Sequence, residues 1–338
     1  MSTVPLSILD RANTRVVNGE TVEAPQIFAE VTARAQAAEA LGYHRFWVAE
    51  HHSVPGIVGS TPTVFLPHLA AATSRIRLGT GGIMVPSHQP LVIAEQIGTL
   101  QALHGSRIDI GLGASVGFTK PVRTALRHTP DAKEHFRDDV DELISYLDGT
   151  AGITAYPQDY SRTELFILTG GGSAEFAASR GLGLVLGGPC VTNGLKTSDK
   201  HSPVVAQYRE SFVASKPRNQ SSYVIASVNI ATASTHQEAE HLVLSEAWAL
   251  TQSRSTGVFA PLEDPRGIRL ETLSAQQRRR LDRALATTIY GTPDEVIEHL
   301  DAVVAYTQAD EILLTGNIWD PEAQRASDRL LMDACRAR

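Results

Sequence analysis

The sequence predicts an α/β fold, a closed (β/α)8 barrel. Short runs of branched and aromatic residues, typical of buried parallel strands, alternate along the chain with segments of helical spacing. Eight such strands can be counted, each followed by a helix, which favours a parallel sheet with helical crossovers. Eight repeats within 338 residues predict closure into a barrel, and an open doubly wound sheet is the alternative.

The elements follow in a regular order. The predicted strands cover residues 4–9, 44–49, 75–80, 107–113, 164–169, 182–186, 222–231 and 310–314. The predicted helices cover residues 24–41, 63–73, 90–103, 131–147, 203–213 and 235–252, and a short one runs from after Ser173 to Ser179. Two more begin at Ser274 and Thr292, and a terminal helix follows the last strand. Gly42 ends the first helix, and Thr292, Pro293 and Glu295 are typical of a helix start. Residues 10–21, 53–62, 113–130 and 187–198 are expected to form loops, and residues 253–286 contain no clear strand.

Composition restricts the class of protein. The hydrophobic fraction of 42% and charged fraction of 20% are typical of one globular domain, here residues 1–338, with a large core. The net charge of −7, with only Arg278-Arg279-Arg280 locally basic, argues against a nucleic-acid partner; that triplet is typical of a solvated helix face or a loop anchor. Two distant cysteines, the lack of a signal peptide and the lack of a membrane-spanning run predict a cytoplasmic protein.

The strand at 44–49 runs directly into Glu50, His51 and His52. Ligands bind at the C-terminal ends of parallel strands, so these side chains are candidates for chemistry. Adjacent histidines on a strand point to opposite faces and are poor co-ligands for one metal, so we expect no metal site. One histidine could be purely structural. The favoured interpretation is an imidazole that donates or accepts a proton at neutral pH.

Two glycine-rich segments also follow predicted strands. Residues 169–173, Thr-Gly-Gly-Gly-Ser, precede a helix, so their backbone could approach a phosphate group at the helix N-terminus. The alternative is a turn in which Ser173 caps the helix. Gly81 and Gly82 end the third strand and could admit a flat ligand. Together these features suggest a phosphorylated planar cofactor such as a flavin mononucleotide.

Several motifs in order along nearly the whole chain resemble the luciferase-like flavin monooxygenases, the family of bacterial luciferase. The matching motifs are residues 41–43 with 47–52, 77–86, 88–90 with 94–96, 107–113, 175–181 and 291–296. The resemblance implies a TIM barrel that binds FMN and uses O2 as co-substrate. In this family reduced FMN and O2 form a flavin C4a-(hydro)peroxide that transfers one oxygen atom, and the reduced flavin usually comes from a separate reductase.

The resemblance also implies roles for single residues. His51 matches a histidine that assists flavin oxidation chemistry, with Glu50 and His52 orienting it or lining the flavin site. Gly81-Gly82 matches a non-proline cis peptide beneath the flavin ring. Thr169, Gly170, Gly171, Gly172 and Ser173 match the phosphate-binding turn. Residues 253–286 match a mobile lid inserted after the seventh strand.

The chain departs from bacterial luciferase just after the fourth strand. A reactive cysteine and a phosphate-binding arginine of luciferase are replaced here by Gly113 and Ala114. Lys120, Arg123 or Arg127 could supply the missing cation.

The sequence therefore predicts an FMN-dependent monooxygenase that hydroxylates or epoxidises a small apolar metabolite, of the secondary-metabolism or antibiotic-biosynthesis type. Expected partners are a separate flavin reductase and a second copy in a homodimer. Two alternatives stay open: hydride transfer with coenzyme F420 on the same barrel, and a flavin-binding protein without turnover. The sequence does not identify the organic substrate.

Overall fold

Eight parallel strands close into a barrel in the computed structural model, which describes residues 4–158, 160, 162–215, 218 and 220–338. β1 pairs with both β4 and β11, and β8 pairs with β9, so the sheet has no open edge at these strands. The predicted barrel is confirmed over the open sheet. The barrel strands are β1 (Leu6–Asp10), β4 (Arg45–Val48), β5 (Arg77–Met84), β6 (Ile108–Gly113), β7 (Glu164–Thr169), β8 (Gly183–Gly187), β9 (Val224–Thr232) and β11 (Glu311–Thr315).

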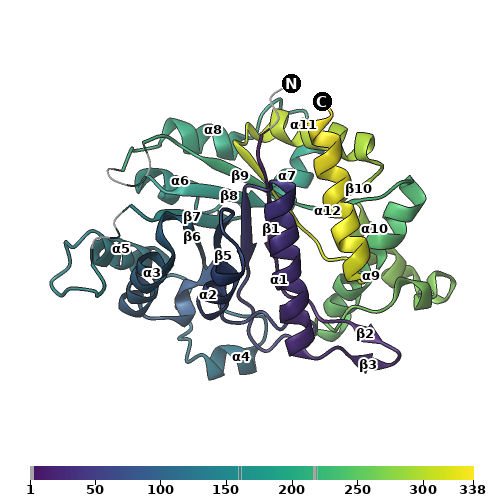
Figure 1. Ribbon diagram of the computed structural model, residues 1–338, viewed down its shortest axis with the longest axis horizontal. Coiled ribbons are helices and arrows are strands. Elements are labelled where there is room, and N and C mark those ends of the chain that lie inside the picture. Colours follow the sequence, from purple (N-terminus) through teal and green to yellow (C-terminus); the bar gives the residue numbers. More distant parts are fainter. Residues whose placement is uncertain (1–3, 159, 161, 216–217, 219) are drawn as a thin grey trace.

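Helices surround the barrel, and α1 and α12 lie side by side where the two ends of the chain meet (Figure 1). The main helices are α1 (Ala24–Leu41), α2 (Pro62–Ala72), α3 (Pro90–His104), α5 (Phe136–Leu147), α6 (Ala174–Ser179), α8 (Pro203–Glu210), α9 (His236–Thr256), α10 (Ala275–Leu285), α11 (Pro293–Thr307) and α12 (Pro321–Arg336). None of the helices in the described part of the chain combines the length and apolar character needed to cross a bilayer.

Capping residues in the sequence predicted some helix boundaries to within a residue or two. Gly42 follows α1 with a φ of 78°, a left-handed conformation that favours glycine, and its N–H bonds the helix carbonyls. At α11, the Thr292 hydroxyl accepts the Glu295 N–H while the Glu295 carboxylate accepts the Thr292 N–H, as the capping pattern predicted.

Four expectations were wrong. The loop predicted at 10–21 contains a hairpin, β2 (Val16–Val17) and β3 (Glu20–Thr21), and the loop at 113–130 contains α4 (Lys120–Ala125). The loop at 187–198 contains α7 (Pro189–Thr192). A further strand, β10 (Thr288–Gly291), pairs with the end of β9. These elements are two to six residues long, so they are too short to show a periodic pattern.

The barrel interior is layered. An apolar cluster of inward-facing residues from six of the strands fills its middle; these are Leu9, Trp47, Ala49, Phe166, Val185, Ile225 and Leu313. At the N-terminal strand ends, which we call the floor, Arg45 forms ion pairs with Asp109 at 2.5 Å and Glu311 at 3.0 Å. The C-terminal strand ends, which we call the mouth, point toward α4 and the β2–β3 hairpin in Figure 1.

Candidate active site

Glu50 lies at the mouth and is the centre of a hydrogen-bonded group. Its Oε1 accepts bonds from His52 Nε2 at 2.6 Å and His88 Nε2 at 2.8 Å, and its Oε2 accepts the Met84 N–H at 3.0 Å. Burial alone would raise the pKa of this carboxyl. The bonds from His52, His88 and Met84 outweigh that effect and lower the pKa of Glu50 to about 2. Glu50 is therefore a carboxylate at neutral pH, and it links the end of β4 to the end of β5.

The same three side chains have a donor set that metals use. One ligand atom from each of Glu50, His52 and His88 lies within 4.8 Å of the other two. The sequence argument considered His51 beside His52 as a ligand pair. The structure instead places His52 with His88, and it places His51 in a different environment.

His51 lines a cavity at the mouth and has an unsatisfied ring nitrogen. Its Nδ1 is buried and has no hydrogen-bond partner among the described residues. The imidazole stacks on Phe118, with ring centroids 6.0 Å apart and an angle of 10° between the planes. Burial, and next the positive charge of Arg11, lower the pKa of His51 to about 4. The imidazole is therefore neutral at pH 7, with one ring nitrogen as a donor and the other as an acceptor.

The cavity beside His51, which we call the His51 cavity, has a volume of about 550 Å³. Its walls come from the loop after β4, from α4 and the residues before it, from α9, and from residues 257–259. They are largely apolar and include Val54, Pro55, Phe118, Val258 and Phe259. Such a cavity, with few polar groups, is typical of a small-molecule site.

Arg11 fixes one wall of this cavity. It follows β1 and forms an ion pair with Glu246 of α9, a carboxylate that also accepts the Asn317 N–H at 2.8 Å. The pair links two loops of the mouth to α9. Sequence analysis missed Arg11 and His88, because each acts through contacts with residues remote in the chain.

Gly81 and Gly82 lie inside β5, which extends beyond its predicted end. The peptide bond between them is cis, as the family resemblance implied. A Cβ added to Gly82 would lie 2.7 Å from the backbone oxygen of Gly111, closer than van der Waals contact allows. Glycine is therefore required at position 82 because the backbone of β6 approaches closely. The strand pairing shifts register between Thr80 and Ile83 at the same point.

The turn at residues 169–173 joins β7 to α6. The Thr169 hydroxyl accepts the N–H groups of Gly171 at 3.0 Å and Ser173 at 3.2 Å. Ser173 occupies the N-cap position but its side chain makes no capping bond, so the alternative role suggested for it was wrong. A Cβ at Gly172 would meet nothing within 4 Å. This part of the turn faces open space that a ligand could occupy.

Arg137 of α5 lies at this turn and donates to the Gly172 carbonyl at 3.3 Å. Sequence analysis had considered Lys120, Arg123 and Arg127. Arg123 instead donates to the Gly117 carbonyl at 3.1 Å. Arg137 was not considered, because α5 precedes β7 in the chain and meets the turn only in the folded protein.

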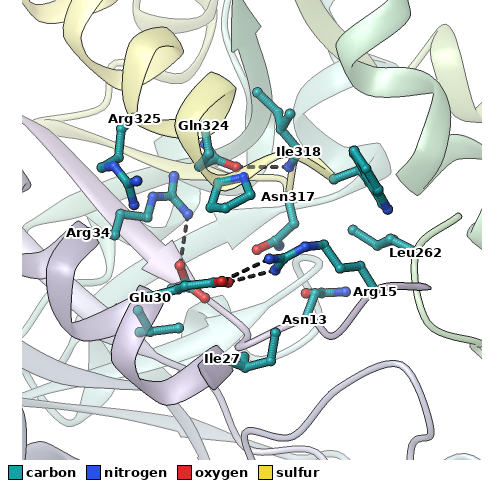
Figure 2. A pocket seen from close by; sticks show the side chains of 14 residues that line it. Asn13, Arg15, Ile27, Glu30, Arg34, Leu262, Asn317, Ile318, Gln324 and Arg325 are labelled. Atoms are coloured by element: carbon teal, nitrogen blue, oxygen red, sulfur yellow. Dashed lines mark hydrogen bonds and ion pairs between the residues drawn. The ribbon is translucent and has the colours of Figure 1, made fainter. Parts of the chain in front are cut away.

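A second crevice, between α1, α12 and the segment after β11, lies outside the barrel interior (Figure 2). Its volume is only about 50 Å³. The charges that line it are satisfied: Arg34 pairs with Asp10 at 2.9 Å, and Arg15 pairs with Glu30 at 2.6 Å (Figure 2). A crevice this small, with its charged side chains in ion pairs, is typical of packing between elements and not of a ligand site.

Comparison with known proteins decides the family. Residues 12–311 match the family model described as luciferase-like monooxygenase. The chain belongs to the luciferase-like monooxygenase family. A protein of Escherichia coli with that name is 32% identical over 98% of this chain and 97% of its own length. The N-acetyl-S-alkylcysteine monooxygenase of Bacillus subtilis is 30% identical over 99% of both chains.

Solved structures agree with this membership of the luciferase-like monooxygenase family. The apo form of MsnO8 matches with a TM-score of 0.81 and 27% identity, covering 99% of this chain and 98% of its own. A diketocamphane monooxygenase solved with FMN and an F420-dependent secondary alcohol dehydrogenase both match with a TM-score of 0.69. At 16% and 13% identity these two share the fold alone, so the family supports a monooxygenase without selecting the cofactor.

Proposed function

We propose that the protein is an FMN-dependent monooxygenase that uses reduced FMN and O2 to hydroxylate or epoxidise a small, largely apolar metabolite. The observation that carries the proposal is His51. Its neutral imidazole, with an unpartnered buried Nδ1, lies in the wall of a largely apolar cavity of about 550 Å³ at the barrel mouth.

The residues around the mouth suit a phosphorylated planar cofactor. The open backbone of the turn at 169–173, with Arg137 beside it, would hold the phosphate. The Gly81-Gly82 segment, which carries no side chains, would lie against the flat ring. Bound reduced flavin would supply the reaction with O2 and the transfer of one oxygen atom to the substrate.

Each polar residue then has a defined task. His51 would hold or move a proton at Nδ1, because its neutral ring has one donor and one acceptor nitrogen. Glu50 and His52 would position the loop that carries His51, since Glu50 is bonded to both β5 and His52. Arg11 would favour negative charge near His51.

Residues 253–286 would act as a lid that excludes water. Val258 and Phe259 contribute to the His51 cavity, and backbone bonds join Phe259 to Gly56 at 2.9 Å and Leu262 to Thr14 at 2.9 Å. A segment in contact with the mouth at these points would shield bound flavin from water if it closed over it.

The proposed partners are a separate flavin reductase and a second copy of the chain. Apolar side chains on the outer faces of α2 and α3 are exposed, namely Val64 at 72%, Val92 at 41% and Leu103 at 63%. Such residues suit a homodimer contact. Sedimentation velocity would test this, and a monomer at micromolar concentration would contradict it.

The proposal is tested by rapid mixing. Protein loaded anaerobically with reduced FMN is mixed with oxygenated buffer, and the return of oxidised-flavin absorbance is followed without substrate. We expect the protein to slow this return by about tenfold or more relative to free flavin, because the enclosed site excludes water.

A second arm replaces reduced FMN with reduced coenzyme F420. Return of oxidised flavin at the rate of free flavin, together with oxidation of bound reduced F420 by a carbonyl acceptor, would contradict the proposal and select hydride transfer. Tight FMN binding with no oxygen transfer to any compound in a substrate screen would select a binding protein without turnover.

A further inference from the structure

We infer that the substrate of the proposed monooxygenase is an organic acid, and that a second compartment of the mouth binds its anionic group. This inference rests on the proposed function and refines it. The compartment, which we call the arginine pocket, has a volume of about 310 Å³. Arg254 of α9 and Arg280 and Arg283 of α10 line it.

The pocket lies within the mouth of the barrel. Ile225 of β9 and Leu313 of β11 belong to the apolar cluster inside the barrel. Side chains two residues further along a strand point to the same face, so Ser227 of β9 and Thr315 of β11 lie one layer nearer the mouth. Both line the arginine pocket. Its base is therefore part of the barrel interior, at the end where ligands bind in this fold.

The charge of the pocket is positive and uncompensated. No Asp or Glu is among the described residues that line it. In the described part of the chain, Arg254 and Arg283 have no ion pair, and Arg280 donates only to the Ser255 hydroxyl. Arg280 and Arg283 are three residues apart on α10, which places them on one face of the helix. Guanidinium groups that converge without a carboxylate form a site for an anion.

Neutral donors complete the site. Asn229 accepts a bond from the Thr315 hydroxyl at its Oδ1, which leaves its side-chain NH2 group to donate. Ser227 and Thr192 add hydroxyl groups. A carboxylate, sulfonate or phosphate accepts several hydrogen bonds at once, so this donor set suits such a group better than it suits a neutral one.

The arginine pocket adjoins the His51 cavity. Leu250 of α9 lines both, and the next turn of the helix contributes Ser253 to the His51 cavity and Arg254 to the arginine pocket. A ligand with its anionic group on the arginines could therefore extend an apolar chain toward His51. The apolar metabolite expected from the sequence then becomes an acid with an apolar body.

The test is calorimetric titration of the FMN-loaded protein with octanoate, octane-1-sulfonate and 1-octanol. These probes share one chain and differ in the head group. The wild type should bind both acids at least about tenfold more tightly than the alcohol, because the acids gain charge-assisted hydrogen bonds. Equal affinity for the acids and the alcohol would overturn the inference.

The matched variants are R254M/R283M and R279M. The double variant should lose the preference for the acids, whereas R279M, on the same helix but outside the pocket, should keep it. Both arginines of the double variant are exposed, and R283M alone repeats the test with a single change. Retention of the preference by the double variant would overturn the inference.

The arginines could instead hold the phosphate of the cofactor, which has the same chemistry. Titration with FMN and riboflavin separates the two. Loss of the preference for FMN over riboflavin in R254M/R283M would overturn a substrate role. If the wild type binds FMN and controls its oxidation but shows no preference for acids, only this inference fails. If it does not bind FMN, the proposed function fails.

Discussion

Arg45 at the floor of the barrel and the arginines of the arginine pocket at its mouth are in opposite states. At the floor, Arg45 is buried and pairs with Asp109, Glu164 and Glu311, and its guanidinium lies 5.2 Å from the centre of the Phe166 ring. At the mouth, Arg254 and Arg283 of the arginine pocket are exposed, and neither forms an ion pair with any residue that the structure describes.

This difference indicates that the paired arginine contributes to the stability of the fold and that the unpaired arginines contribute to ligand binding. A buried charge is costly unless it is paired, so the partners of Arg45 are part of the fold. An exposed arginine keeps its water and needs no partner for the chain to fold. Arg45 should therefore affect unfolding, and the arginines of the arginine pocket should affect ligands, as is usual for the two faces of such barrels.

Arg45→Met should have the largest effect on stability. It leaves Glu311 buried without its cationic partner and Asp109 with Arg77 as its remaining cation, and we expect the free energy of unfolding to fall by about 3–5 kcal/mol. Urea denaturation measures this. The free energy of unfolding of Arg283→Met should stay within about 0.5 kcal/mol of the wild-type value. Equal losses in the two variants would remove the distinction between floor and mouth.

His51→Ala should have the largest effect on chemistry. Loss of a group that holds a proton should slow the oxygen reaction of bound reduced flavin by about 10²-fold. Rapid mixing with O2 gives the rate, and His299→Ala, an exposed histidine of α11, is the control. A wild-type rate in His51→Ala would exclude the proposed role.

The low pKa of His51 also predicts a pH dependence of stability. Above pH 6.5 the imidazole is neutral in the folded and unfolded chain and has no effect. As the pH falls from 6.5 toward 4, the unfolded chain takes up a proton that folded His51 does not accept, so the free energy of unfolding falls by about 3 kcal/mol. His51→Gln should lose less over this range in urea denaturation. Identical pH profiles would show that His51 is not buried as described.

Glu50→Gln should have a smaller effect on stability. The glutamine amide has only one acceptor oxygen, so it cannot keep all the bonds from His52, His88 and Met84. We expect the free energy of unfolding at pH 7 to fall by about 1–2 kcal/mol. Glu134→Gln, an exposed change, is the control. Thermal unfolding that is unchanged in Glu50→Gln would mean that the network does not stabilise the mouth.

Local sequence signals predicted the features that are determined by residues close together in the chain, such as the ends of helices and strands. Gly42 ended α1 at the expected residue, and the run of apolar residues before Glu50 identified the strand that carries it to the mouth. Contacts between remote residues carry no such signal. Arg45 and Glu311 are 266 positions apart, and Glu50 and His88 are 38 apart. The arginine pocket was missed for the same reason, although Arg278-Arg279-Arg280 was noticed as a basic run.

The most direct test of the central claim, that the mouth is the functional end, is hydrogen–deuterium exchange with and without reduced FMN under anaerobic conditions. Cofactor binding should slow exchange at residues 50–52, 117–122 and 170–174, and it should leave the floor loops at 105–107 and 309–310 unchanged. Protection confined to the floor loops would contradict the claim.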